Sequence, residues 1–417
     1  MIQEKKQPMK RFFSGALAAL LTITLALLAL TGVFAAVPET DASKTLADPA
    51  GRVIGVAARG VWSIYPENSL EGLLAVRGTG LTHVLADVSV TADGVAVLLP
   101  ENGAARMLGA SVENVSAMMS KDVLSMPMKN RLGGEANAFT EYLVSTLEDA
   151  LPALGRAGLT PVLKFDVSAL DKILPLTGGT DAVLWLTGKE KDVKAAAATL
   201  GDTPFLTEIR SNVIFHVTSF VDKMKDAGAL GVVLKTSNRY GVNFYRSTLK
   251  RFDILRAVID CTEPETAGYR EDTVKWWDDA ISRGFSVIVT DDAEGFGRYL
   301  ADCESARARL SNLYSYATNE AKIPAFNGEL LNDYEKAYTD GVNTSKALLD
   351  DASSSLQDLR DAYTALNSAL KTIELNYSEI EAGVAGKTVT LPRILLCVAF
   401  AAAVVAVQVY FYKRRKA

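Results

Sequence analysis

The sequence predicts an α/β protein whose main unit is a closed (β/α)8 barrel of the TIM type. Short β-rich runs alternate with helical stretches from residue 53 on, and eight such runs can be counted. Strand–helix alternation is typical of a parallel sheet, and eight repeats over roughly 250 residues match a closed barrel. An open, doubly wound sheet of seven strands is the alternative. No glycine-rich nucleotide fingerprint follows the first run, which favours the barrel.

The elements follow one another in a regular order. The predicted strands are 53–58, 82–90, 160–165, 182–187, 204–209, 230–235, 254–259 and 285–290. The predicted helices are 68–78, 146–156, 189–199, 217–227, 243–251, 268–283 and 294–302. Residues 95–145 break the alternation: they open with a hairpin arm in DGVAVLLPENG and form an insertion before the third barrel strand. Such insertions usually build the top face of a barrel, where active sites lie.

The pattern changes after the barrel, which we expect to span residues 53–302. Strand-like runs disappear, and 304–319, 327–350 and 354–373 carry apolar residues at helical spacing. On the last of these, one stripe is formed by Leu356, Leu359, Ala362, Leu366, Leu370 and Ile373. The sequence therefore predicts a small three-helix bundle over 303–375, followed by a linker at 376–390.

Two uncharged segments flank the predicted barrel and bundle. Residues 12–36 follow four basic residues, and 394–412 precede KRRK. Each is long enough to cross a bilayer as a helix, and the positive-inside rule then places both chain ends in the cytoplasm. We expect 1–36 to be a signal-anchor or, because VFA precedes Ala36, a cleaved signal peptide. After a linker at 37–52, the bulk is expected outside the cell membrane, with a transmembrane helix at 391–412 and a basic cytoplasmic tail at 413–417.

Charge and cysteine content narrow the possible partners. The net charge is −5; residues 1–36 carry +3 and 391–417 carry +5, which leaves −13 for the part between them. Such a surface repels anionic polymers, so nucleic acid is not an expected partner. No zinc-type spacing is present. Cys261 and Cys303 are predicted at opposite ends of the barrel, too far apart for a disulfide.

Five stretches together resemble the glycerophosphodiester phosphodiesterase family. They are GVAARGVWSIYPENSLEG, HVLADVSVTADGVAVLLPE, STLEDAL, PVLKFDV and GFSVIVTDDAEGF, in the family's order and over about residues 53–302. The resemblance implies a (β/α)8 barrel that cleaves glycerophosphodiesters to glycerol 3-phosphate and an alcohol. It also implies two histidines as general acid and base, and a divalent metal held by a Glu-x-Asp pair and a third Glu. Phosphodiester cleavage needs such proton-transfer groups and a cation on the phosphate oxygens.

At the positions that the resemblance assigns to catalysis and metal binding, this sequence has mostly different residues from the family. The family's His-Arg-Gly is Ala58-Arg59-Gly60, and Pro100 stands where the second histidine is expected. Leu85 and Lys164 replace two of the three metal-binding acids, and Asp87 is kept. We therefore expect no catalytic residue, no metal and no other cofactor. Of the two histidines, His83 begins the second strand at the bottom of the barrel, and His216 lies in a loop near the top.

The remaining polar residues at the top predict a ligand site rather than a catalytic one. The expected ligand-binding residues are Arg59, Glu67, Asn68, Asp87, Lys164 and Asp166. Lys164 and Asp87 lie on neighbouring strands and are expected to pair. The pair is either a structural one or, with Arg59, part of a phosphate site. Glu67 and Asn68 either cap the helix at 68–78 or contact the ligand.

The bundle sequence SSSLQDLRDAYTALNSALKTI, with the preceding ALLDDA, resembles the FIVAR module of exported Gram-positive wall and sugar-acting proteins. This resemblance implies a spacer or a module that contacts a wall glycan.

Taken together, the sequence predicts a membrane-anchored pseudoenzyme of the cell surface that binds a phosphodiester, glycerol phosphate or wall glycan. A working metal-dependent phosphodiesterase of lipid metabolism, with Glu67, Asp87, Glu101 and Asp166 around a metal, is one alternative. A structural spacer is the other.

Overall fold

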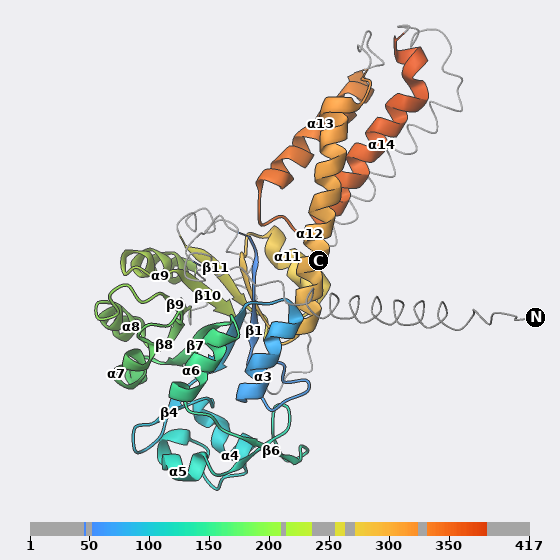
Figure 1. Ribbon diagram of the computed structural model, residues 1–417. Helices are drawn as coiled ribbons and strands as arrows, with labels where there is room; N and C mark the ends of the chain where they lie inside the picture. The colour runs from blue at the N-terminus through green and yellow to red at the C-terminus, as the bar shows by residue number, and fades with distance from the viewer. Residues whose placement is uncertain are drawn as a thin grey trace, which may run out of the picture.

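The structure is a computed structural model that describes residues 46, 52–209, 214–235, 255–262, 272–323 and 332–381 (Figure 1). Both predicted membrane segments, the predicted helix at 243–251 and Cys397 lie outside these residues, as do most of the two predicted linkers. Among the helices that are described, none combines the length and the apolar composition needed to cross a bilayer.

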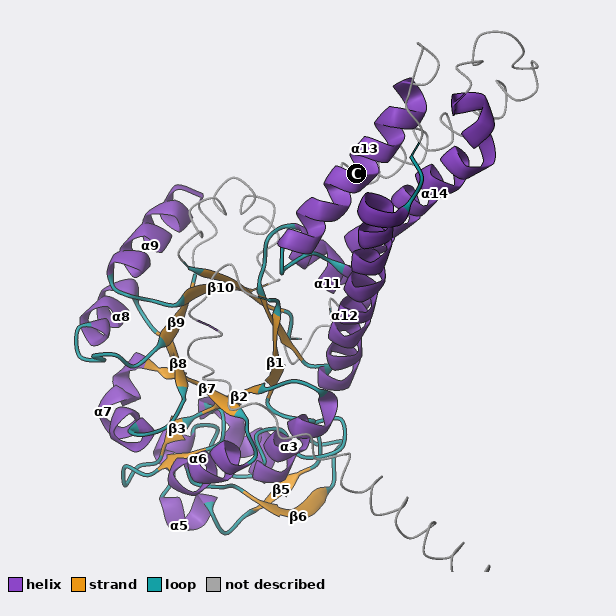
Figure 2. Cartoon of the chain, turned by 45° about the horizontal axis from the view of Figure 1, so that its top comes forward, coloured by secondary structure: helices purple, strands orange, loops and turns teal. Residues whose placement is uncertain are grey.

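Eight parallel strands close into a barrel, as the sequence predicts (Figure 2). In chain order they are β1 (Ile54–Ala58), β2 (His83–Asp87), β7 (Thr160–Asp166), β8 (Val183–Thr187), β9 (Phe205–Glu208), β10 (Gly231–Lys235), β11 (Arg256–Asp260) and β12 (Val287–Thr290). Around the ring the order is β1-β12-β11-β10-β9-β8-β7-β2, and β1 pairs with both β2 and β12. All eight predicted strands are confirmed.

The strands are apolar on both faces because both faces are covered. Their inward side chains fill the barrel with an apolar layer that includes Val56, Ala58, Leu85, Val162 and Trp185. Their outward side chains pack against the surrounding helices. Side chains therefore fill the barrel along most of its length. We call the end of the barrel at which the carboxyl ends of the strands lie the mouth.

Helices cover the outside of the barrel: α3 (Leu70–Ala75), α6 (Leu147–Arg156), α7 (Leu170–Ile173), α8 (Glu190–Ala197), α9 (Ile214–Asp226) and α11 (Val274–Ser282). The short 3-10 helix η1 (Val76–Thr79) continues α3. No sequence pattern indicates α7. This helix has a single turn, and the segment after it contains Pro175, Gly178 and Gly179, which do not sustain a longer helix.

The insertion after β2 forms a small layer with its own core. Strands β3 (Ser89–Val90) and β4 (Ala96–Val97) are antiparallel, which confirms the predicted hairpin. They are followed by α4 (Ala104–Leu108), α5 (Ser120–Val123) and the antiparallel pair β5 (Pro127–Lys129) and β6 (Phe139–Leu143). Buried residues of this core include Val97, Leu99, Met107, Val115 and Met128. Because the insertion leaves the carboxyl end of β2, it lies on the mouth side of the barrel (Figure 1).

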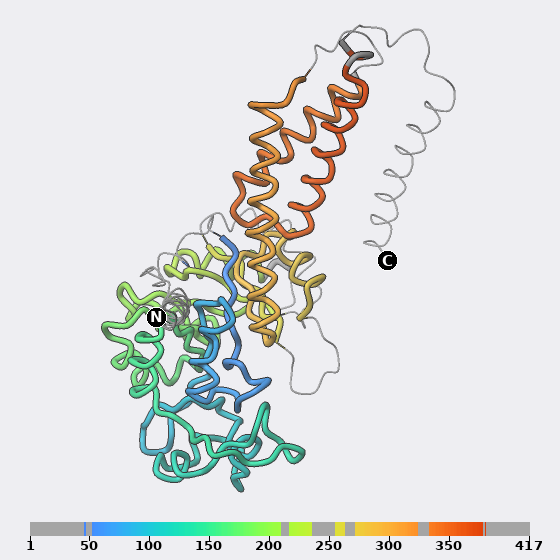
Figure 3. The backbone as a smooth tube through the Cα atoms, turned by 45° about the vertical axis from the view of Figure 1, so that its right-hand side comes forward, coloured from blue at the N-terminus to red at the C-terminus, as the bar shows by residue number. Residues whose placement is uncertain are grey.

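Three long helices complete the described chain: α12 (Ala293–Ser315), α13 (Asn332–Asp350) and α14 (Leu356–Glu381). They pack against one another and extend beyond the barrel (Figure 3). The helices expected at 294–302 and 304–319 are in fact one helix, α12, which a short π-helical segment (Tyr316–Glu320) extends. No proline and, after Gly297, no glycine interrupts α12, so its backbone hydrogen bonds continue without a break.

Candidate ligand site at the barrel mouth

Charged side chains from many of the strands gather at the mouth. They stand at or just beyond the strand ends and are Arg59, Asp87, Lys164, Glu208, Lys235, Asp260 and Asp291. Below them lies the apolar layer, in which Ala58 and Leu85 are fully or almost fully buried. Both side chains therefore serve to pack the apolar layer, and neither carries a titratable group.

Arg59 is held between two carboxylates. Its Nη1 donates to Glu67 at 3.0 Å and its Nη2 donates to Asp291 at 2.8 Å. Burial opposes the charge of Arg59, but the neighbouring carboxylates outweigh it and raise the pKa of the guanidinium. Arg59 also has a positive φ of 59°, so its backbone is strained for a residue with a side chain. The residue joins the first and last loops of the mouth.

Glu67 and Asn68 belong to the same network, and neither caps α3. The N-cap is Ser69, whose Oγ accepts from the Gly72 N–H at 3.1 Å. Glu67 is fully buried and also accepts a hydrogen bond from Arg106 of the insertion. Burial raises the pKa of Glu67, while the two guanidinium groups oppose that shift. The insertion is thereby fixed to the barrel through Glu67.

Asp87 is bound by Asn68 on both its backbone and its side chain. The Asp87 N–H donates to Asn68 Oδ1 at 2.9 Å, and Asn68 Nδ2 lies 3.5 Å from Asp87 Oδ2. Asn68 has a positive φ of 56°, which asparagine tolerates better than most residues. The Asp87 side chain is therefore turned toward the first loop.

Lys164 makes a different contact from the one that the sequence predicts. Asp87 and Lys164 are register partners on β2 and β7, but no ion pair within 4 Å joins them among the described residues. Instead, Lys164 Nζ lies 4.0 Å from Asp260 Oδ2 on β11, which is diametrically opposite β7 in the ring. The expected pairing is wrong because Asn68 holds Asp87 while the long lysine chain crosses the barrel opening.

Trp185 supports the Lys164 ammonium. Its ring centroid is 4.5 Å from Nζ, within the range of a cation–π contact. Burial lowers the pKa of Lys164, but Asp260, Asp87 and Glu208 raise it above its ordinary value, so the group is charged. Among the described residues, its three N–H donors have no hydrogen-bond acceptor, since Asp260 is too distant. The Lys164 side chain is 21% exposed at the mouth.

The other carboxylates at the mouth are already engaged. Asp260 accepts from Thr262 Oγ1 at 2.6 Å, and Glu208 lies 3.7 Å from Lys235. Asp166 is exposed and accepts from Ser168, so it does not join the ion network. Glu101 is exposed on the insertion, next to Pro100, and accepts from Ser116.

These positions bear on the metal alternative. Across the part of the chain that the structure describes, no three His, Cys, Asp or Glu side chains are grouped as metal ligands would be. The four carboxylates of the alternative metal site therefore do not come together.

The structure confirms the predicted place of His83 but not that of His216, which lies in the first turn of α9 (Ile214–Asp226) and not in a loop before it. His83 is buried as the first residue of β2, at the end of the barrel away from the mouth, as predicted. His216 belongs to α9, which follows β9; its side chain is outside the described part. Cys261 is buried, Cys303 is partly buried, and no disulfide joins them.

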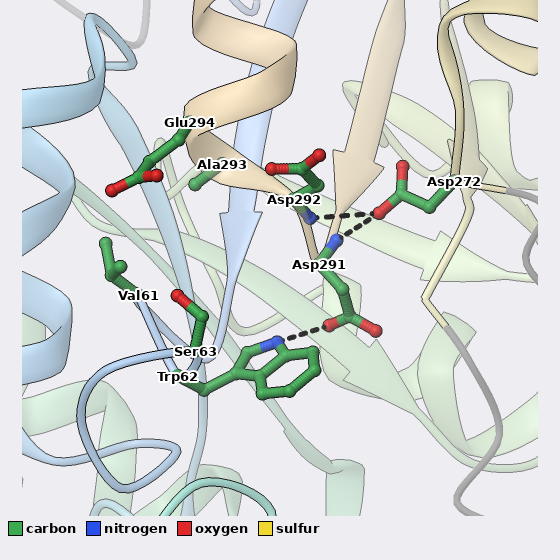
Figure 4. Close-up of a pocket in the computed structure, with 8 residues that line it drawn as sticks. All are labelled: Val61, Trp62, Ser63, Asp272, Asp291, Asp292, Ala293 and Glu294. Atoms are coloured by element: carbon green, nitrogen blue, oxygen red, sulfur yellow. Dashed lines mark hydrogen bonds between the residues drawn. The ribbon is translucent and has the colours of Figure 1, made fainter.

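Three residues important at the mouth were missed by sequence reasoning: Trp62, Asp272 and Asp291. They help line a pocket of about 190 Å³ beside the first and last loops, with Asp292 and Glu294 on its acidic wall (Figure 4). The Trp62 indole donates to Asp291 at 3.1 Å. Asp291 could have been found from VTDD at the end of the last strand, whereas Asp272 falls inside the predicted helix 268–283 and in the structure stands just before α11, which begins at Val274.

Asp272 fixes the backbone at this point. It accepts from the N–H groups of Asp291 at 2.6 Å and Asp292 at 3.1 Å, from Trp277 Nε1 at 2.6 Å, and from Thr290 Oγ1 at 2.7 Å. Burial raises the pKa of Asp272 to about 6, although these hydrogen bonds favour its ionised form. The loop that carries Asp291 to Arg59 is thus held from beneath by a second carboxylate.

Comparison with known proteins gives likenesses in structure alone. No family model matches the sequence, and no curated protein matches it. A glycerophosphoryl diester phosphodiesterase from Parabacteroides distasonis is similar with a TM-score of 0.48 and 14% identity, over 61% of this chain and 88% of that one. One from Thermotoga maritima gives a TM-score of 0.44 and 18% identity, over 59% and 97%.

A third solved structure is an Oleispira antarctica phosphodiesterase in complex with the product sn-glycerol-3-phosphate. It gives a TM-score of 0.46 and 13% identity, over 58% of this chain and 94% of that one. At such identities the likeness is one of chain fold, and the chemistry of the mouth has to be judged from its own residues.

Proposed function

We propose that this chain is a glycerophosphodiester phosphodiesterase-like barrel that has lost hydrolysis and serves as a binding module for a phosphate-bearing ligand at the cell surface. The ligand class is a phosphodiester or a glycerol phosphate. We also propose, from the sequence of the FIVAR-like bundle, that the bundle contacts a wall glycan. The two hydrophobic segments at 12–36 and 394–412 support attachment to the cell membrane with the barrel outside.

The loss of hydrolysis is supported by what occupies the reactive positions. Cleavage of a phosphodiester needs one group to accept a proton and another to donate one. Ala58 and Pro100 have no titratable atom, and Ala58 and Leu85 are buried in the apolar layer beneath the mouth. The retained Arg59 is bound on both sides by carboxylates, which compete with a phosphate for its guanidinium.

The observation that carries the binding proposal is the Lys164 ammonium. It is charged, lies over an aromatic ring at an open barrel end, and has no hydrogen-bond acceptor among the described residues. A phosphate oxygen can accept the N–H groups that Asp260 is too distant to reach. The surrounding carboxylates oppose an anion, so we expect modest affinity that depends on displacement of Asp260.

Isothermal titration calorimetry of the full-length chain with glycerol 3-phosphate tests this proposal. We expect one-site binding that is lost in Lys164→Met and kept in Lys172→Met, whose lysine is exposed and paired with Asp171. Asp260→Asn should bind more tightly, because it removes a competing anion while the ammonium stays. Absence of binding by the unaltered chain, or equal binding by Lys164→Met, would contradict the proposal and favour the structural spacer.

A further inference from the structure

Helix α12 belongs to the barrel and to the bundle at once. It begins at the mouth, three residues after the end of β12, and runs back along the outside of the barrel. Glu304 on α12 forms an ion pair at 3.1 Å with Arg52, which precedes β1 and therefore marks the end of the barrel away from the mouth. The remaining residues of α12, up to Ser315, extend beyond the barrel.

The first half of α12 is packed firmly into the barrel wall. Phe296 and Tyr299 are buried and stack with centroids 5.5 Å apart. Trp277 of α11 meets both rings edge-on, at 4.9 Å and 5.7 Å. Aromatic contacts in this arrangement add to the free energy of burial. A rotation of α12 relative to the barrel would break this cluster.

The start of α14 rests on the same surface. Leu356 is 2% exposed and belongs to the main core of the barrel. Its N–H donates to the Tyr299 hydroxyl at 3.3 Å, and the Gln357 N–H donates to Asp278 at 3.3 Å. The first N–H groups of a helix need acceptors from elsewhere, and here they come from α11 and α12.

The end of α13 is also held by α12. Arg307 donates to the carbonyl oxygens of Leu348 at 2.9 Å, Leu349 at 3.2 Å and Asp351 at 2.8 Å. A cation at these orphan carbonyl groups stabilises the carboxyl end of a helix. The loop from α13 to α14 is thus bound where the bundle meets the barrel.

We infer that α12, α13 and α14 form a stalk that is rigidly joined to the barrel and directs the mouth away from the bundle's far end. A hinge between the two parts would have to break a continuous helix, withdraw Leu356 from the barrel core and free the Arg307 contacts. This inference does not depend on what the mouth binds.

The direction of the stalk follows from the course of its helices. α14 starts at the barrel and has 26 residues, so it spans about 40 Å at a rise of about 1.5 Å per residue. Figures 1 and 3 show it leading away from the barrel on the side opposite α4 and α5. The described part of α14 ends there, far from the mouth. A ligand therefore reaches the mouth on the side of the molecule opposite the described carboxyl end of α14.

Pulsed electron spin resonance distances test the rigid junction in the full-length chain. Spin labels are placed at Lys191→Cys on α8 and Leu375→Cys on α14, both exposed. The background replaces Cys261, Cys303 and Cys397 with alanine. We expect one narrow distance distribution, which Leu356→Asp broadens and which Ala365→Asp, an equal charge on the exposed face of α14, leaves narrow.

Should Leu356→Asp not fold, Tyr299→Phe combined with Asp278→Ala removes the acceptors of α14 without adding a buried charge. This variant should broaden the distribution as well. A broad distribution for the unaltered stalk would overturn the inference. So would a distribution that stays narrow in every junction variant that folds.

Discussion

Lys164 is the residue on which the proposed use of the barrel mouth depends. An acid at this position would add a negative charge beside Asp87, Glu208 and Asp260. The lysine instead places a cation among them, lying over Trp185 and reaching toward Asp260 across the opening. Because its N–H groups lack protein acceptors in the described part, the same group can stabilise the fold and receive a phosphate.

Replacing Lys164 by methionine should therefore lower the free energy of unfolding. Asp260 would lose its cation but keep its hydrogen bonds from Thr262, so we expect a loss of about 1–3 kcal/mol. Adding Asp260→Leu should recover part of the loss, whereas adding Asp87→Leu should not, since Asp87 is held by Asn68. Urea denaturation of the three variants measures this. If adding Asp87→Leu to Lys164→Met recovers stability and adding Asp260→Leu does not, Lys164 pairs with Asp87, as the sequence suggested, and not with Asp260.

Asp272 gives the structure a specific dependence on pH. Its pKa is about 6 in the folded chain and 3.8 in the ordinary reference state. The folded state therefore binds this proton more tightly than the unfolded state does. The stabilising contribution is complete below about pH 4 and is lost as the pH rises through about 6.

Chemical denaturation between pH 4 and pH 7 should show this loss as a difference between the unaltered chain and Asp272→Asn, whose amide does not titrate. Subtracting the unfolding free energy of Asp272→Asn from that of the unaltered chain removes the contributions of the other carboxylates, which both proteins share. If the two unfolding free energies run parallel through this range, Asp272 titrates at its ordinary pKa.

Residue pairings of this kind lie beyond what the sequence predicts. Strand ends at a barrel mouth identify Arg59, Asp87 and Lys164 as neighbours of the site. They do not say which partner each charge takes, because Lys164 reaches β11 and Arg59 reaches the loop after β12. Asp260 could have been included by the same rule, since it directly follows the predicted strand 254–259. The choice among acceptors depends on side-chain length and on Asn68, which already holds Asp87.

At the scale of elements, α12 depends on a close approach at Gly297. A Cβ at this position would overlap the carbonyl oxygen of Thr79 in η1, which is backbone and has little room to move. Gly155 in α6 faces open space. The two glycines therefore provide a matched pair of test sites. Alanine favours the helix at both positions, but an added Cβ meets backbone atoms at Gly297 and open space at Gly155.

Gly297→Ala should lower the free energy of unfolding by about 1–3 kcal/mol through overpacking. Gly155→Ala should raise it by up to about 1 kcal/mol, since alanine favours the helix. Thermal or urea unfolding of both variants checks the pair. An equal gain in stability for both would show that α12 does not approach η1 so closely.

The elements themselves were largely predictable, since strands covered on both faces give uninterrupted apolar runs and the barrel repeats them eight times. The hairpin at 89–97 followed from DG between apolar residues. What failed was the separation of helices 294–302 and 304–319, because the change from barrel to bundle leaves no proline or glycine at residue 303. Helix continuity there is decided by tertiary contacts on both sides.

At the scale of the molecule, the ion-pair network at the mouth and the inferred rigid stalk agree with the proposal that the protein presents a binding surface. Arg59 and Glu67 join the first loop to the last loop and to the insertion, so the mouth is fixed by ion pairs among its own residues. The proposed loss of hydrolysis rests on Ala58 and Pro100, which carry no proton-transfer group at the positions that the family resemblance would assign to histidine. The proposed binding depends on the Lys164 ammonium, which lies at the mouth over Trp185.

The most direct test is the hydrolysis of glycerophosphocholine by the purified full-length chain, with and without added Ca²⁺ or Mg²⁺, under conditions in which glycerol 3-phosphate binding is measured in parallel. We predict that glycerol 3-phosphate binds and that choline is released no faster than in buffer alone. Turnover in the ordinary enzymatic range, about 1 per second or faster, would contradict the proposed loss of catalysis.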